Sequence, residues 1–526
     1  MSLALPAAAA AGGSPRTAGM GPGPLGVSAP TTLRVMTFNI FYGGDELNLG
    51  TGRWCVNPNG CQATFAKVVG AIRASGADIV GLEEGQHNTS RVAEALGWYA
   101  SERLQIVSRY PLIDPPGGNG VYLFAELAPG RIVAVASVHL PAVPYGPYRV
   151  RDGMSRAKLR ALEESVRLPA IQPQLAVLPA LAEAGIPVFL VGDFNSPSHL
   201  DWTAEVAEVR PAVRYPFRWP VSAALEQAGF RDSYREVRPD PVAVPGFTWT
   251  PGGPESNPRE VHDRIDWVLA AGPAVATESR ILGELGGPDV DVPVEPFPSD
   301  HRGVVSTFVV TPGVAPAFVA VESRRLSVGD ELNVAFHAPG EPGEGVVLVP
   351  AGLQPDDAVA ELATGPAGPV DGALRFPTAS LSPGAYEAVL VAGDRSPIAR
   401  SPFWLYEAGS PTTLTTSKGT YRTGEPITVS WANAPGMRWD WVAIFRPRSG
   451  RNNPYATTCS TGSCGNGGYL AYEYTHTSIE GSTSFDRDSA GAWPLAPGAY
   501  EVRYLLDDGY RLVARSARFE VVPRRR

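Results

Sequence analysis

Residues 187–195, PVFLVGDFN, form the most informative stretch of this sequence. The apolar run has the length of a strand buried on both faces, and polar residues Asp193 and Asn195 follow directly. A buried strand has no structural need for an acid and an amide at its end, so the stretch predicts a strand that delivers polar side chains to the rim of a sheet. Asp and Asn also form ordinary turns, and one such stretch is compatible with either interpretation.

The same arrangement recurs on both sides of this stretch. Apolar runs of strand length carry polar residues at their ends in LRVMTFNI (33–40), ADIVGLEE (77–84), RIVAVASVHL (131–140) and RIDWVLA (264–270). Between them, residues 62–76 and 156–168 place apolar side chains at helical spacing, which predicts helices packed outside the sheets. The repeated pattern is hard to explain by turns alone.

The ordered motifs TFNI, GLEE, SRYP, SVHL, GDFN, RIDW and PSDH resemble those of the endonuclease/exonuclease/phosphatase superfamily, the DNase I-like metal-dependent phosphoesterases. The resemblance covers residues 33–310. It implies an α+β fold, a four-layered α/β/β/α sandwich, with which the alternation of strands and helices is compatible. It also implies a metal-dependent phosphoric ester hydrolase.

The resemblance implies a metal site built from Asn39, Glu84 and Asp300. Residue chemistry agrees, because Mg²⁺ takes oxygen ligands and is commonly held by one or two carboxylates with amide oxygens and substrate phosphate. Mn²⁺ and Ca²⁺ are the alternative metals. We expect Glu83, next to Glu84, to be a neighbouring acid that is solvated or lies behind the site.

Water attack on phosphorus needs a base and stabilisation of the charge on the phosphate oxygens. The resemblance pairs His301 with Asp266, and a carboxylate bonded to one imidazole nitrogen leaves the other free for proton transfer. It implies that Asp193 and Asn195 orient the water and contact the phosphate. His139 is then expected to stabilise the phosphate or to protonate the leaving oxygen.

Four further residues are candidates for substrate binding. Arg109 belongs to the SRYP motif, which could equally be a structural turn. The irregular segment 141–156 follows His139 and contributes Tyr145, Tyr148 and Arg149. The alternative is a loop packed on the domain with its arginines in water.

The overall charge limits the substrate class. Lys and Arg number 44 against 53 Asp and Glu, a net charge of -9. This sign does not favour a protein that binds by neutralising many phosphates. A secreted phosphodiesterase acting on a small molecule or a lipid head group is therefore favoured, an extracellular nuclease on DNA or RNA is an alternative, and an inactive nuclease-like adhesion protein is a third hypothesis.

The sequence after residue 312 predicts two all-β sandwich domains, at 313–408 and 409–526. LSVGDELNVAF (326–336) aligns with YRTGEPITVSW (421–431), and LSPGAYEAVLV (381–391) with LAPGAYEVRYL (495–505). They loosely resemble Ig-like accessory domains, which either bind an unknown surface or ligand or serve as spacers. Aromatic residues such as Trp431, Trp439, Trp441 and Tyr474 are candidates for a binding face, although aromatic residues in sandwiches usually belong to the core.

The first 30 residues and the cysteines indicate where the protein is expected to be located. Residues 1–30 are rich in Ala, Gly and Pro and are expected to be a signal remnant and flexible leader before the phosphoesterase domain, 31–312. No apolar run reaches the roughly 18 residues of a membrane-spanning helix. The cysteines form two close pairs, Cys55 with Cys61 and Cys459 with Cys464, which we expect to be disulfides of a secreted, extracellular or periplasmic protein.

Overall fold

The computed structural model describes residues 29–524 apart from 49–50, 52, 56–59, 116, 119, 255–256, 366–369, 448–467 and 510. The first domain contains two stacked seven-stranded sheets. In spatial order, the path of the first sheet is β14 (Val290–Val294), β13 (Ala274–Glu284), β15 (Gly303–Val310), β1 (Thr31–Asn39), β4 (Ile79–Glu83), β6 (Ile106–Ser108) and β5 (Tyr99–Ser101). That of the second is β11 (Arg231–Asp232), β12 (Asp266–Ala271), β10 (Val188–Asp193), β9 (Arg131–His139), β8 (Leu123–Ala128) and β7 (Leu112–Ile113), and β16 (Gly313–Val314) also pairs with β9.

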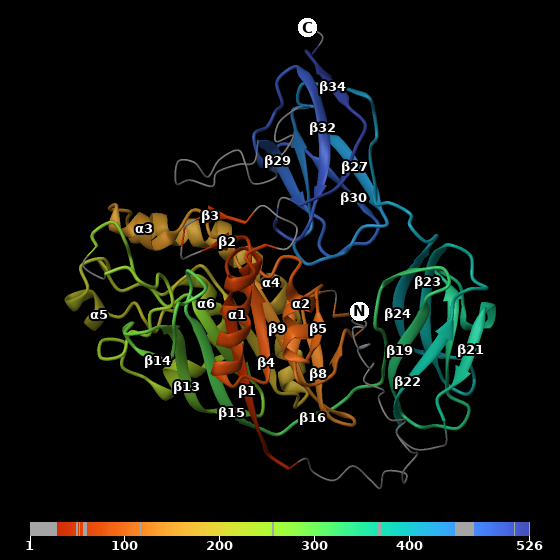
Figure 1. Ribbon diagram of the computed structural model, residues 1–526, viewed down its shortest axis with the longest axis horizontal. Helices are drawn as coiled ribbons and strands as arrows, with labels where there is room; N and C mark the ends of the chain where they lie inside the picture. Colours follow the sequence, from red (N-terminus) through yellow and green to blue (C-terminus); the bar gives the residue numbers. More distant parts are fainter. Residues whose placement is uncertain are drawn as a thin grey trace, which may run out of the picture.

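Helices cover the outer faces of both sheets (Figure 1). The first sheet carries α1 (Gln62–Ser75) and α2 (Thr89–Leu96), and the second carries α4 (Arg156–Glu183) and α6 (Pro220–Gln227). The remaining short elements are α3 (Gly146–Arg151), α5 (Ala204–Val209), α7 (Ser233–Val237), the 3-10 turn η1 (Tyr42–Gly44) and the hairpin of β2 (Leu47–Asn48) and β3 (Arg53–Trp54). The structure thus has the expected four-layered α/β/β/α fold.

The helix α1 shows how local sequence produces a layer. Phe65, Val68, Val69 and Ile72 follow the spacing of one helical face, and all four are buried against the first sheet. The helix ends where Gly76 adopts a left-handed conformation, with φ 72°, which glycine reaches without steric cost.

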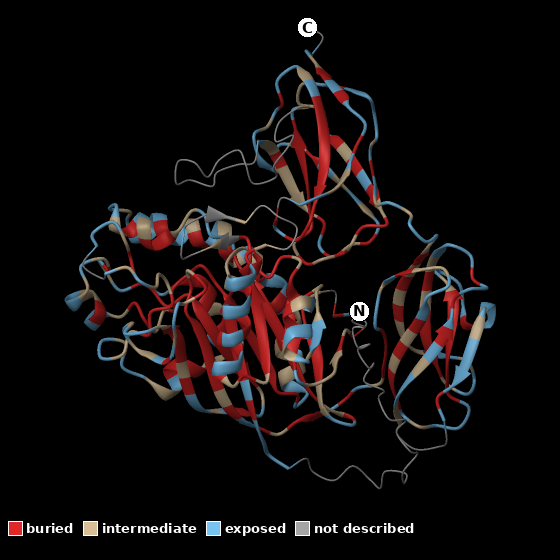
Figure 2. Cartoon of the chain, viewed as in Figure 1, coloured by how far each residue is buried: buried red, intermediate tan, exposed pale blue. Residues whose placement is uncertain are grey.

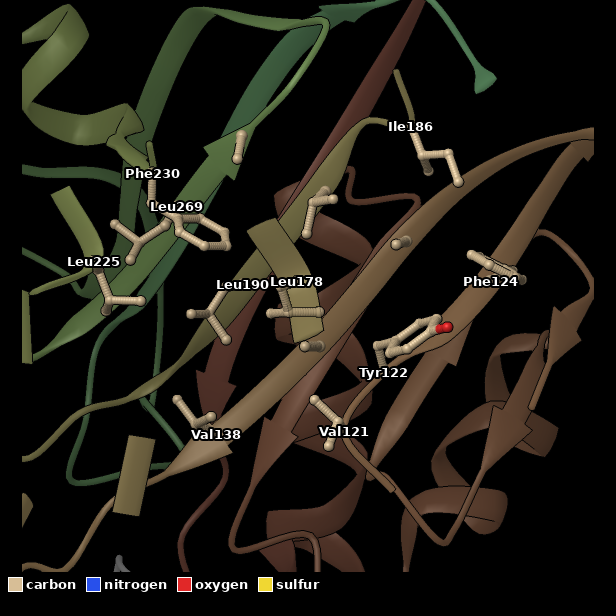
Figure 3. Close-up of a cluster of buried hydrophobic side chains, with 14 of the residues drawn as sticks. Val121, Tyr122, Phe124, Val138, Leu178, Ile186, Leu190, Leu225, Phe230 and Leu269 are labelled. Atoms are coloured by element: carbon tan, nitrogen blue, oxygen red, sulfur yellow. The ribbon is translucent and has the colours of Figure 1, made fainter. Parts of the chain in front are cut away.

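The strand β10 shows why the central runs are apolar throughout. Phe189 and Val191 point into the core between the two sheets, whereas Val188 and Leu190 point into the core beneath α4 and α6. Figure 3 shows the second of these cores, in which Leu190 lies near Leu178 of α4. Because successive side chains alternate between faces, both faces of β10 are buried.

The second domain is a sandwich of two sheets. Their orders are β17 (Phe318–Val321), β19 (Glu331–Ala338), β22 (Val370–Pro377), and β18 (Arg325–Ser327), β24 (Pro397–Tyr406), β23 (Gly384–Val391), β20 (Gly345–Pro350), β21 (Ala360–Ala363), with the 3-10 turn η2 (Pro355–Asp357) before β21.

The third domain also has two sheets. One is β25 (Thr413–Thr416), β27 (Ile427–Ala432), β30 (Gly481–Phe485); the other is β26 (Thr420–Arg422), β34 (Phe519–Val522), β32 (Gly498–Leu505), β28 (Trp441–Phe445), β29 (Tyr469–Tyr474), β31 (Ala490–Gly491), with β33 (Leu512–Arg515) paired to β32. Figure 2 shows buried strands at the centre of each domain.

The two sandwiches share a hydrogen bond that the sequence repeat anticipates. Tyr386 donates its hydroxyl to the carbonyl oxygen of Ser382 at 2.8 Å, and Tyr500 donates to that of Ala496 at 2.6 Å. The two tyrosines occupy the same position of the aligned GAYE motifs, and both bonds reach back four residues to fix the corner before the strand. The structure confirms that the C-terminal region consists of β-sandwich domains.

The disulfide between Cys55 and Cys61 is present as expected. Cys459 and Cys464 lie outside the described residues. Among the helices that the structure describes, none combines the length and the apolar character needed to span a bilayer.

Candidate active site

Strand register brings the predicted polar residues together at one end of the two sheets. In the second sheet Asp193 lies opposite His139 of β9 on one side and Asp266 of β12 on the other. In the first sheet Asn39 lies opposite Glu83 of β4. The two sheets meet where Asn39 Nδ2 donates a hydrogen bond to Asp193 Oδ2 at 3.2 Å.

His301 and Asp266 form a buried pair. His301 Nδ1 lies 3.0 Å from Asp266 Oδ2 and 3.2 Å from Oδ1, and the Trp249 ring lies 4.8 Å from the imidazole, centre to centre. Burial lowers the pKa of His301, but the charges of Asp266 and Asp193 outweigh it, so the pKa is raised well above its ordinary value. Asp266 therefore fixes the ring through Nδ1 and makes the imidazole a stronger base.

Asp193 connects this pair to a second imidazole. Its Oδ2 atom lies 3.6 Å from His301 Nε2 and 3.6 Å from His139 Nε2. Burial raises the pKa of Asp193, His301 lowers it and Asp266 raises it again, with a net rise. The side chain of His139 retains 15% of its exposure and that of His301 retains 6%, so His139 is the more accessible of the two imidazoles.

Two site residues adopt a left-handed backbone at the ends of their strands. Glu84 has φ 54° after β4, and Asn195 has φ 47° after β10. Non-glycine residues in this region are uncommon and gather at functional sites, where the fold compensates for the strain. Asn195 donates from Nδ2 to the carbonyl oxygen of Leu140 at 3.0 Å, and its backbone N–H donates to Asp193 Oδ1 at 2.8 Å.

Two further carboxylates, those of Glu84 and Asp300, lie beside this centre, and no ion pair with a Lys or Arg is described for either. Glu84 accepts a hydrogen bond from Asn39 Nδ2 at 3.3 Å and from the backbone N–H of Tyr42 at 2.8 Å. Asp300 Oδ1 is buried and has no hydrogen-bond partner among the described residues. Burial raises the pKa of Asp300 to about 7, the nearby charge of His301 opposes this shift, and Glu84 and Asp193 reinforce it.

This donor set fits a divalent metal ion. Oxygen ligands that repel one another are stabilised by a cation, and the buried oxygen of Asp300 lacks any other described partner. Ligand atoms of Asp193, Asp266 and His301 also lie within 4.8 Å of one another. Asn39 faces the acids with its amide nitrogen, while its Oδ1 accepts from the backbone N–H of Phe41 at 3.0 Å, so its role as a ligand stays a prediction.

Glu83 is not a solvated acid. It is fully buried between the sheets, where Thr37 Oγ1 donates to it at 2.9 Å and Ser137 Oγ donates at 3.1 Å. Burial, with the charge of Asp266, raises its pKa well above the ordinary value. Of the two expected locations, Glu83 therefore takes the one behind the site.

The structure corrects the expectation for Arg109. Its backbone N–H bonds the carbonyl oxygen of Asp78, which precedes β4, whereas Glu84 follows the other end of that strand. The guanidinium pairs with Asp78 at 3.6 Å and lies 5.2 Å from the Trp98 ring. Because β6 runs antiparallel to β4, the SRYP motif is carried to the end of the sheet that lies away from the site.

The other three substrate-binding candidates lie on and before α3. Tyr145 donates to Asp263 at 3.2 Å and Tyr148 donates to Glu260 at 2.6 Å, so both hydroxyls have protein partners. Arg149 is exposed. Their part in substrate binding stays a prediction.

The third domain adds residues that the sequence did not place at the site. The ring of Trp439 lies 6.5 Å from that of His139, and the ring of Tyr474 lies 5.4 Å from that of Trp439. Tyr474 donates its hydroxyl to Asp508 at 2.9 Å. A DDG sequence predicts a tight turn there, but nothing local indicates which domain the turn faces.

Comparison with known proteins places these observations in a family. The sequence profile described as the Endonuclease/Exonuclease/phosphatase family matches residues 36–301. An uncharacterized protein of Caenorhabditis elegans is 30% identical over 310 residues, which cover 53% of this chain and 92% of that protein. Two solved structures are also similar. An endonuclease/exonuclease/phosphatase from Beutenbergia cavernae is 19% identical, covers 71% of this chain and 100% of its own, and has a TM-score of 0.33.

The second is a mannosyl-6-phosphatase of Bacteroides thetaiotaomicron, which is 14% identical, covers 53% of this chain and 99% of its own, and has a TM-score of 0.31. The profile match spans every motif from TFNI to PSDH and takes in half of the chain. The chain therefore belongs to the endonuclease/exonuclease/phosphatase family, whose activities are those of phosphoesterases, nucleases and phosphatases.

Proposed function

We propose that the protein is a secreted, Mg²⁺-dependent phosphodiesterase that hydrolyses its substrate by in-line attack of a water molecule. The observation that carries this proposal is the His301–Asp266 pair, whose free Nε2 lies 3.6 Å from the same Asp193 oxygen that His139 approaches. Two imidazoles around one carboxylate provide a base on one side of a phosphorus centre and a proton donor on the other.

Each protein group has a defined task in this mechanism. Asp266 holds His301 Nδ1, which directs Nε2 toward the water and lets it take the proton. Asp193, fixed by the backbone N–H of Asn195, orients that water. His139 Nε2 donates a hydrogen bond to the phosphate or its leaving oxygen, where negative charge develops.

Glu84 and Asp300, with Asn39 beside them, are the residues that would hold the metal. Mg²⁺ bound there would neutralise charge on the phosphate oxygens and organise the substrate. The cluster of acids supports this assignment, because a bound cation would offset both the burial and the nearby negative charges that raise the pKa of Asp300. Mn²⁺ and Ca²⁺ are tested as alternatives.

Two further features support the remaining parts of the proposal. The net charge of -9 favours a small diester or a lipid head group over nucleic acid, which relies on cationic contacts. The Cys55–Cys61 disulfide suits an oxidising compartment, which supports secretion.

Purified full-length protein should hydrolyse a chromogenic phosphodiester with Mg²⁺ and lose this activity in EDTA. The same assay on a phosphomonoester, sphingomyelin, phosphoinositides and plasmid DNA distinguishes the substrate classes.

His301→Ala should lower kcat by about 100-fold or more, because general-base catalysis contributes on that order. Asp300→Asn should raise the Mg²⁺ concentration needed for half-maximal activity.

His337→Ala is the matched control. His337 Nδ1 also lies against a carboxylate, that of Asp371 at 2.6 Å, but in the second domain. Its loss should leave kcat unchanged. An absence of hydrolysis with every metal and substrate would contradict the proposal and favour an inactive, adhesive protein.

A further inference from the structure

A tight turn of the third domain faces the first domain. In residues 506–509, which we call the Asp508 turn, the backbone N–H of Gly509 donates to the carbonyl oxygen of Leu506 at 2.8 Å. Asp507 and Asp508 have φ of 45° and 60°, the pattern of a type I′ hairpin turn. Gln105 Nε2 of the first domain donates to Asp507 Oδ2 at 2.9 Å and so anchors the turn across the interface.

Neighbouring residues hold this turn in one conformation. Asp440 accepts a hydrogen bond from the backbone N–H of Asp507 at 2.9 Å, and Trp441 Nε1 donates to the carbonyl oxygen of Gly509 at 2.9 Å. The backbone of Trp439 bonds both acids: its N–H donates to Asp507 Oδ1 at 3.1 Å, and its carbonyl oxygen accepts from the N–H of Asp508 at 2.8 Å. A surface so constrained is preorganised for binding.

The Asp508 turn presents two rings and a carboxylate beside the active site. The Trp439 ring lies 6.5 Å from His139 and 5.4 Å from Tyr474, whose hydroxyl donates to Asp508. Asp508 is exposed to solvent, so its carboxylate is accessible to a ligand. The indole Nε1 of Trp439 is buried and has no hydrogen-bond partner among the described residues.

The electrostatics of this junction favour a cation over an anion. The enclosing protein and the charge of Glu84 raise the pKa of Asp508 to about 6, and His139 opposes the shift, so the turn adds an acid to a site already rich in acids. The guanidinium of Arg438 is buried, donates to the carbonyl oxygen of Leu104 and lies 4.9 Å from the centre of the Trp439 ring, so one face of that ring already contacts a cation of the protein and a ligand would use the other face. Aromatic faces together with a carboxylate are the groups that recognise alkylammonium ions.

We propose that Trp439, Tyr474 and Asp508 determine specificity by binding a cationic alkylammonium group esterified to the phosphate that the first domain hydrolyses. This inference rests on the proposed function. It makes the third domain one side of the substrate site, and it disfavours substrates with a second phosphate beside Asp508, because this carboxylate would repel that phosphate.

A matched pair of substrates tests the proposal on the full-length protein with Mg²⁺. p-Nitrophenyl phosphorylcholine and ethyl p-nitrophenyl phosphate share a leaving group, and only the first carries an ammonium. We expect kcat/KM to favour the choline ester by about tenfold, in line with cation–π energies of about 1–2 kcal/mol. Asp508→Asn and Trp439→Leu should lower this ratio toward one, whereas Asp488→Asn, at an acid whose side chain is 81% exposed, should leave it unchanged.

Titration calorimetry with choline chloride separates this inference from the proposed function. Wild-type protein should bind choline, and Trp439→Leu should weaken binding at least fivefold, while Trp439→Phe retains an aromatic face and part of the affinity. If neither ester is hydrolysed, the proposed function fails, and choline binding then tests the cation site by itself. Equal kcat/KM for the two esters, or choline binding that is absent or unaffected by both Trp439→Leu and Asp508→Asn, would overturn the inference.

Discussion

The same pair of residue types has different surroundings in two places of this molecule. His301 and His337 each lie against a carboxylate, Asp266 and Asp371 respectively. Among the described residues, His301 alone of the two has a further acid, Asp193, within 3.6 Å of its second ring nitrogen. An imidazole that is oriented by one acid and faces another is equipped for proton transfer, whereas the ring of His337 stacks on that of Phe318, 6.2 Å away.

The buried carboxyl group of Asp440 should make the stability of the protein depend on pH. Burial raises its pKa to about 6, although hydrogen bonds, including those from Asp507 and Tyr504, lower it. An Asp in the unfolded chain titrates near pH 3.9, so between about pH 4 and 6 the folded state holds more protons than the unfolded state. The stability that this group contributes is complete below that window and is lost as the pH rises through it.

Asp440→Asn should remove this dependence. We expect the difference in free energy of unfolding, wild type minus variant, to fall by no more than about 3 kcal/mol from pH 4 to pH 6. Thermal unfolding followed by calorimetry at several pH values measures it, with the exposed Asp488→Asn as control. A difference that stays constant across this range would show that Asp440 has the same pKa in both states.

Among the secondary-structure elements, β10 is the one on which the site depends most directly. It pairs with β9 and β12 and ends at Asp193, so a shift of β10 moves Asp193 relative to both His139 and Asp266. Gly192 permits this pairing because a Cβ atom there would lie 2.1 Å from the carbonyl oxygen of Val138. No side chain fits between the two backbones at this point.

Gly192→Ala should therefore reduce stability and activity together. Overpacking of this kind costs about 1–3 kcal/mol, and the displaced Asp193 should lower kcat in the folded fraction. Gly70→Ala is the control, because Gly70 lies within α1, has open space around its Cβ position, and should gain about 0.5–1 kcal/mol from higher helix propensity. Denaturant unfolding and kcat measure both effects, and a Gly192→Ala variant as stable and active as wild type would contradict the argument.

At the scale of the whole molecule, the third domain docks on the first through buried and partly buried polar contacts. Gln105 bonds Asp507, Arg438 donates to the carbonyl oxygen of Leu104 at 3.3 Å, and Arg103 donates to Thr477 at 3.0 Å. In Figure 1 the third domain, in blue, lies above the first-domain strands, whereas the second domain lies to one side. Contacts of this type favour one relative placement of the two domains. A different docking would leave these polar groups buried without a partner, which is costly.

Gln105→Ala should weaken this docking. Asp507 is fully buried, and loss of its Gln105 partner should cost about 1–3 kcal/mol. We expect calorimetry to show the third domain unfolding at a lower temperature than in wild type. Gln172→Ala, at an exposed position of α4, should not change the transition, and an unaltered transition in Gln105→Ala would indicate that this bond contributes nothing to docking.

The placement of Arg109 decides between its two expected roles in favour of a structural turn. Its motif lies in the first domain, as expected, but the position of a motif along the chain does not reveal which end of the sheet it reaches. The antiparallel register of β6 with β4 decides this, and it places Arg109 beside Asp78.

The sequence by itself determined the strands, the helices of the first domain, the sandwich repeat and the polar residues at the strand ends. These follow from local patterns, since apolar runs, helical spacing and aligned GAYE motifs act over a few residues. Tertiary structure alone decided that Asn39 bridges the two sheets, that Glu83 is buried, and that Trp439 and Asp508 face His139. Those arrangements depend on strand register and domain docking between segments up to several hundred residues apart, for which a single sequence contains no local signal.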